Sequence, residues 1–194
     1  MRFRQRNAIF LVVALAALVT PLSLWALWKP IRALAPDWVG VRCYEQGICT
    51  DDPSRLADAA SLKLEAMSFV KAWAGPFEAE PRMIFCTTAA CDKSFGFKGN
   101  AAFNVGAKAL VVASRGWKPH YIRHELIHCV QVERIGGFRM LLHTPVWLIE
   151  GMAYSASQDP RRPLQEPWEG YRKQYEEWAQ QDTPATLWSR AAAL

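Results

Sequence analysis

The sequence predicts an α+β domain behind one N-terminal transmembrane helix, and three observations predict it. Residues 8–28 form an uncharged apolar run near the start of the chain. Residues 82–86 and 108–114 are short apolar runs, the second rich in β-branched residues and bounded by glycines, as in buried strands. Longer segments repeat apolar residues at three- and four-residue steps, as in helices. The 194 residues, 51% of them hydrophobic, suffice for one folded domain.

Charge is distributed unevenly along the chain, and this distribution excludes a nucleic-acid partner. The formal net charge is +5. Five of the 23 basic residues precede Asp37, and the remaining 18 equal the 18 acidic residues in number. All acidic residues lie at or after Asp37, so the folded part is formally neutral. A protein that binds nucleic acid concentrates basic charge on its folded surface, and this sequence does not.

The N-terminal run predicts a signal anchor. Residues 8–28 would form a helix long enough to cross a hydrocarbon core of about 30 Å. Residues 1–7 are basic and would form a cytoplasmic tail, which makes the membrane a partner and places the rest of a single-pass protein outside the cytoplasm, on the periplasmic side if it is bacterial. A cleaved signal peptide is the alternative, with a small-residue site at Ala33 to Ala35, but its apolar region usually spans only about 7–15 residues.

The five cysteines indicate an oxidising compartment. Cys43 and Cys49 are close in sequence, as are Cys86 and Cys91, so each pair could close a short loop as a disulfide. Neither pair has the two-residue spacing of zinc knuckles or thioredoxin motifs. Cys129 is the odd cysteine, and we expect a small buried core residue there.

The remaining chain divides into a connector and one domain. Residues 29–52 contain two prolines and two glycines and would form the connector, and residues 53–194 would form the domain. Helices are predicted for residues 53–74, for 118–134, from Pro145 onward, and for about 166–181. The segment between the two predicted strands alternates aromatic residues and glycines, as in a hairpin or a loop-rich sheet.

The predicted helix 118–134 carries the sequence His-Glu-Leu-Ile-His, in which His124 and His128 are four residues apart. Residues i and i+4 lie on one face of a helix, so both imidazoles can point at one metal ion. Glu125 is offset by about 100° and can accept a proton from a zinc-bound water without being a ligand. An ordinary helix with a partly exposed polar face is the alternative for so short a pattern.

A catalytic zinc ion needs a third protein ligand, and Glu150 is the candidate. It lies in the sequence WLIEGMA, residues 147–153, on the next predicted long helix. Gly136 and Gly137 can end the first helix and let the chain turn back. Two antiparallel helices would then bring Glu150 to the two histidines.

The two motifs together resemble the gluzincin branch of the zincin metallopeptidases, a group that contains thermolysin and the M1 and M61 aminopeptidase-type enzymes. The resemblance covers roughly residues 100–155. It implies a zincin-like catalytic domain, one zinc ion bound by His124, His128 and Glu150, and Glu125 as general base. It also implies that residues 108–114 form an edge strand, which would pair with an extended peptide substrate.

The resemblance further implies a side chain that stabilises the oxyanion of the tetrahedral intermediate. Tyr171 on the third predicted helix is our preferred candidate, and the alternatives are Tyr154, Tyr175 and His143. A carboxylate that orients one histidine ligand is also expected, with Asp159 and Glu133 as candidates.

The sequence therefore predicts a membrane-anchored zinc metallopeptidase, a hydrolase that cleaves peptide bonds with a zinc-activated water. The alternative is a catalytically inactive zincin-fold binding or scaffold protein of the cell envelope. The small size of the domain and the undecided oxyanion residue motivate this alternative, which predicts bound zinc without turnover.

Overall fold

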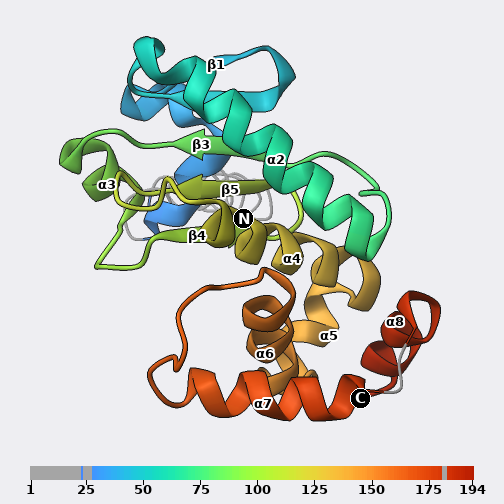
Figure 1. The fold of residues 1–194 in the computed structure, drawn as a ribbon. Helices are drawn as coiled ribbons and strands as arrows, with labels where there is room; N and C mark the ends of the chain where they lie inside the picture. The colour runs from blue at the N-terminus through green and yellow to red at the C-terminus, as the bar shows by residue number, and fades with distance from the viewer. Residues whose placement is uncertain (1–22, 24–27, 181–182) are drawn as a thin grey trace, which may run out of the picture.

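The computed structural model describes Ser23, residues 28–180 and residues 183–194, and it has an α+β fold with one mixed sheet (Figure 1). The strands are β1 (Arg42–Tyr44), β2 (Ile48–Thr50), β3 (Arg82–Phe85), β4 (Ala102–Val105) and β5 (Ala109–Val112). The α-helices are α2 (Leu56–Ala74), α3 (Ala89–Phe95), α4 (Pro119–Ile135), α5 (Gly137–Leu142), α6 (Val146–Ala156), α7 (Trp168–Ala179) and α8 (Pro184–Ala193). Short 3-10 helices are η1 (Lys29–Leu34), η2 (Pro36–Val39), η3 (Glu45–Gly47) and η4 (Pro53–Arg55).

The strands follow the order β1-β2-β3-β5-β4 across the sheet. The central pairs β2–β3 and β3–β5 are parallel, and the outer pairs β1–β2 and β4–β5 are antiparallel. The sequence-based expectation that residues 108–114 form an edge strand is wrong, because β5 lies between β3 and β4. The strand at that edge is β4, which pairs antiparallel with β5.

Both faces of the central strands are buried, which explains their continuous apolar sequences. On β3, Met83 and Phe85 belong to the larger core, which includes residues of α2, α4 and α6, while Ile84 faces a smaller core. Val111 on β5 joins Ile84 in this smaller core beside η1 and α3. In Figure 1, α6 and α7 lie on the far side of α4 from the sheet. This arrangement makes α4 the central helix of the molecule.

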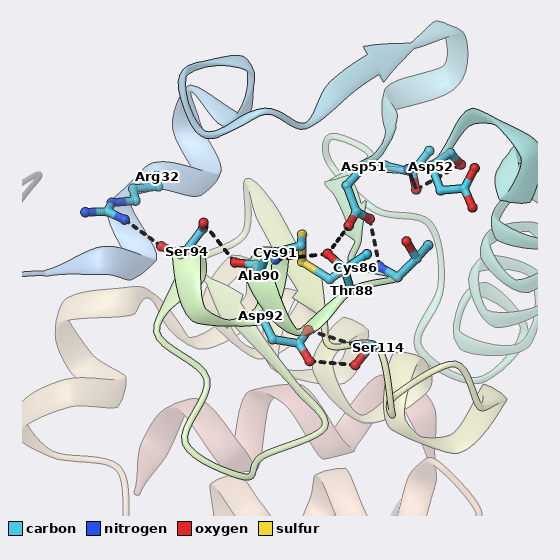
Figure 2. Close-up of a disulfide and its surroundings, with 12 residues drawn as sticks. Arg32, Asp51, Asp52, Cys86, Thr88, Ala90, Cys91, Asp92, Ser94 and Ser114 are labelled. Carbon is cyan, nitrogen blue, oxygen red and sulfur yellow. Dashed lines mark hydrogen bonds between the residues drawn. A yellow bond between two sulfur atoms is a disulfide. The ribbon is translucent and has the colours of Figure 1, made fainter.

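Two disulfides confirm the predicted pairs, Cys43–Cys49 and Cys86–Cys91. Cys49 is in β2, which is part of the sheet, so the predicted connector 29–52 contributes two of the five strands. Figure 2 shows the second disulfide, which links Cys86, directly after β3, to Cys91 in α3, across the turn between them. There Asp51, just after β2, accepts hydrogen bonds from the Thr87 N–H and the Thr88 hydroxyl, both at 2.7 Å. The turn is therefore tied to the neighbouring strand.

The described part of the structure does not support the predicted single-pass membrane helix or the localisation that rests on it. No helix in the described part of the chain is long and apolar enough to cross a membrane. The predicted segment, residues 8–28, lies outside the described residues except for Ser23 and Trp28. The described fold is α+β, and its two disulfides are typical of an oxidising, extracytoplasmic environment.

Candidate metal centre

Helix α4 places His124 and His128 one turn apart, so that their imidazole rings approach each other. Their Nε2 atoms are 3.1 Å apart and the rings meet edge to face. The helix begins with Pro119 in its first turn and ends before Gly136, whose φ of 95° an L side chain rarely adopts. These boundaries agree with the predicted helix 118–134 to within one residue.

Glu150 on α6 completes a cluster of three candidate ligands. One carboxylate oxygen lies 3.6 Å from Nε2 of His124 and the other lies 3.8 Å from Nε2 of His128. In a tetrahedral zinc site with bonds of about 2.0–2.2 Å, neighbouring ligand atoms are about 3.4 Å apart. One ligand atom from each residue lies within 4.8 Å of the other two, so the cluster could hold one metal ion.

A glutamine that the sequence analysis did not consider orients one of these ligands. Oε1 of Gln131 lies 2.7 Å from Nδ1 of His128 and accepts a hydrogen bond from its N–H, which leaves the Nε2 lone pair of His128 directed at the cluster. The amide nitrogen of Gln131 donates to the carbonyl of Ile149 at 2.9 Å, on the helix that carries Glu150. Gln131 is fully buried and therefore connects the two halves of the site.

The carboxylates predicted for this orienting role lie elsewhere. Glu133 accepts hydrogen bonds from the backbone N–H groups of Glu78 and Ala79. Asp159 is paired with Arg161. A glutamine three residues after the second histidine lies on nearly the same helix face, and this spacing is the sequence signal that could have identified Gln131.

Glu125 is buried beside the three candidate ligands. Burial raises the pKa of Glu125 to about 7, an effect that the charge of Glu150 reinforces and that His128 and the backbone of Asn104 on β4 oppose. Burial also lowers the pKa of His128, with a further contribution from His124, which keeps its imidazole neutral and able to bind a metal. Burial alone would raise the pKa of Glu150, but its interactions with the two histidines lower it.

These residues line an open cleft of about 630 Å³. Its walls come from β4 and the loop before it, from α4 and α6, and from the segment that leads into α7. Volumes of about 300–1,000 Å³ are usual for sites that bind small molecules. Glu150 is the most exposed of the three candidate ligands, with 26% of its side chain accessible.

Of the four predicted oxyanion candidates, Tyr154 is the one among the residues that line this cleft. Its ring packs against that of His124, with centroids 4.5 Å apart. Burial raises the pKa of Tyr154 to about 12, so its hydroxyl stays protonated and can donate a hydrogen bond. Tyr121, which the sequence analysis did not single out, also lines the cleft.

The other three candidates lie outside the cleft lining. The preferred residue Tyr171 packs against Trp168 on α7, with ring centroids 5.8 Å apart. Tyr175 is a buried member of the larger core. His143 is exposed in the turn between α5 and α6.

Cys129 is buried and has no disulfide partner, and burial raises the pKa of its thiol, as expected for a core cysteine.

Comparisons with known proteins found no relative. No protein-family model matches the sequence, and no match was found among the curated proteins or the solved structures.

Proposed function

We propose that the protein is a zinc-dependent metallopeptidase of the gluzincin type, with zinc held by His124, His128 and Glu150. The observation that carries this proposal is the convergence of three ligand atoms from two helices beside the buried Glu125, in an open cleft. Two imidazoles and one carboxylate are a donor set of catalytic zinc sites, which keep one position free for water or substrate.

The bound zinc ion would polarise the substrate carbonyl and lower the pKa of the attacking water. Glu125 would accept the proton of that water and deliver it to the leaving amine. Its position one residue after His124 places it beside the ligands without taking a ligand position. Gln131 would hold His128 in the tautomer that the metal requires.

Two features of the cleft support a peptide substrate. Strand β4 lies at one edge of the sheet and contributes Ala102, Phe103 and Asn104 to the cleft lining. An edge strand offers backbone groups with which an extended peptide can pair. On β4 the backbone of Asn104 already bonds Glu125, and the carbonyl of Ala102 accepts from Asn100. The Tyr154 hydroxyl, next to His124, is now our candidate to stabilise the oxyanion, in place of Tyr171.

The substitution Glu125→Gln tests this proposal. It keeps the size of the side chain and removes the base, so we expect zinc content to stay near one ion per chain. The rate of peptide hydrolysis should fall about 100- to 10,000-fold. The measurement combines metal analysis with chelator-sensitive cleavage of a peptide library. Glu177→Gln, on the exposed side of α7, is the matched control and should keep both zinc and activity.

Equal hydrolysis by Glu125→Gln and the wild type would contradict the proposed mechanism. A wild-type chain with stoichiometric zinc and no turnover on any peptide would instead favour the alternative, an inactive zincin-fold binding or scaffold protein.

A further inference from the structure

The segment between α6 and α7 forms one wall of the cleft, and Arg161 is its charged residue there. The buried carboxylate of Asp159 holds the guanidinium of this arginine in place. Nε of Arg161 donates to both oxygens of Asp159, at 2.9 and 3.1 Å, and Nη2 donates to Oδ2. The Asp159 side chain is 2% exposed and that of Arg161 is 47% exposed. Asp159 therefore holds one edge of the Arg161 guanidinium, and the other edge is exposed to solvent.

The backbone of this segment is also fixed. Nη1 of the buried Arg172 donates to the carbonyl of Arg161 at 3.1 Å, and the N–H of Leu164 donates to Glu169 at 2.9 Å. Burial alone would raise the pKa of Asp159, but its hydrogen bonds with Arg161 and the arginine charge lower it, so the carboxylate is ionised at neutral pH. The guanidinium position is thus set before any ligand arrives.

The outer edge of Arg161 is close to the metal centre. Its guanidinium carbon lies 5.1 Å from the ring centre of Tyr121 and 5.9 Å from that of Tyr154. Tyr154 in turn packs against the ring of His124. In the part of the chain that the structure describes, Nη1 of Arg161 has no hydrogen-bond partner. One tyrosine therefore separates this unpaired donor from a candidate metal ligand.

The charge of the rest of the lining favours an anion. Apart from the residues of the metal centre, the charged side chains among the described residues of the cleft are Arg115 and Arg161. Asp159 balances the charge of Arg161. Arg115 donates to the carbonyls of Gly99 and Asn100 and forms no ion pair within the described residues, so its positive charge is uncompensated. A guanidinium presents paired donors that match a carboxylate, and the fixed position of Arg161 reduces the entropy cost of binding one.

The geometry points to Arg161 as the specificity residue of the cleft, which binds a substrate carboxylate close to the bond that is cleaved. This inference rests on the proposed peptidase function and narrows its substrate class. The carboxylate is either the free C-terminus of a peptide or the side chain of an aspartate or glutamate. Both sources present the same two oxygens to the arginine.

The test compares matched peptides on the full-length, zinc-loaded chain. In the first pair, one peptide ends in a free carboxylate and the other in an amide. In the second pair, one peptide has glutamate beside the cleavage site and the other has glutamine there. For the wild type we expect kcat/KM to favour the carboxylate form by about 10- to 100-fold in at least one pair, since a hydrogen bond to a charged group has that effect. The pair that shows the preference identifies the source of the carboxylate.

Arg161→Gln should remove this preference, so that kcat/KM becomes the same for the carboxylate and neutral members of each pair. Arg162→Gln is the matched control, because Arg162 is the next residue in the chain, is 62% exposed and pairs with Glu176. It should keep the wild-type preference. Circular dichroism and thermal unfolding check the fold of each variant. If Arg161→Gln does not fold, Arg161→Lys keeps the charge without the paired donors and should reduce the preference several-fold.

A second readout separates this inference from the proposed function. Dissociation constants of the same peptides are measured on chains that also carry Glu125→Gln, where turnover is not needed. A carboxylate preference in binding that Arg161→Gln removes would support the inference even if the wild type hydrolysed no peptide. The inference would be overturned if the wild type bound and cleaved both members of each pair equally well. It would also be overturned if Arg161→Gln kept the preference for the carboxylate peptide.

Discussion

At the residue scale, the site depends on how one histidine is oriented. His128 can bind a metal through Nε2 because its other ring nitrogen donates to Gln131. The same glutamine donates to the backbone of α6 and so couples the histidine to the helix that carries Glu150. Groups of this kind fix the tautomer and the ring plane of a metal-binding histidine, which makes them nearly as important as the ligands.

We expect Gln131→Leu to weaken zinc binding about 10- to 100-fold, because a leucine cannot accept a hydrogen bond from Nδ1–H of His128. The measurement is a competition titration against a chelating dye, with circular dichroism to verify the fold. Gln174→Leu, an exposed change on α7, should bind zinc like the wild type. Unchanged zinc affinity in Gln131→Leu would show that Gln131 does not orient the ligand.

The three candidate ligands could be predicted from sequence, and the tyrosine that lines the cleft beside them could not. His124 and His128 share a helix face by spacing alone, and Glu150 follows on the next long helix. Tyr154 and Tyr171 are both close in sequence to the motifs, but helical spacing does not tell which of them faces the cleft. That depends on the packing of α7 against α6, which turns Tyr171 toward Trp168.

At the element scale, α6 and α7 pack unusually closely at Gly151, the residue after Glu150. A Cβ atom at this position would overlap the carbonyl oxygen of Tyr171 and lie 2.8 Å from Cβ of Tyr175. The first of these is a backbone atom, so no side-chain rotation can relieve the clash. The absence of a side chain at Gly151 therefore sets the distance of α7 from the helix that carries Glu150.

Gly151→Ala should consequently destabilise the protein by about 1–3 kcal/mol, the usual cost of overpacking a core. Since α7 would be pushed away beside Glu150, zinc affinity should fall as well. Urea unfolding and zinc titration measure the two effects. Gly137→Ala is the control, because its Cβ would meet Val132 at an ordinary 3.6 Å. An alanine at Gly151 that leaves stability unchanged would contradict the close packing.

The strand order is the element-scale feature that sequence could not provide. The runs at 82–86 and 108–114 are predicted as strands, and the structure has β3 and β5 there. Residues 102–105 contain fewer consecutive apolar residues, yet they form the edge strand β4 beside the cleft. An edge strand need not be buried on both faces, so its hydrophobic pattern is weaker than that of a central strand.

At the scale of the whole molecule, the sheet and its two disulfides form one half and the helices α6 and α7 form the other, with α4 between them (Figure 1). The candidate metal centre lies where α4 meets α6, and the cleft opens between this junction and β4. A metal ion bound there would therefore link the two halves. A ligand that binds the folded state and not the unfolded state stabilises a protein, so the metal ion should raise its stability.

The most direct test of this account is the zinc content and thermal stability of the full-length chain, compared between the wild type and Glu150→Ala. We expect one zinc ion per wild-type chain and a higher melting temperature with zinc than after chelation. Glu150→Ala should lose most of the zinc and the stabilisation that zinc provides, because two imidazoles alone hold the ion weakly. A wild-type chain without stoichiometric zinc, or a Glu150→Ala variant that retains it fully, would contradict the account.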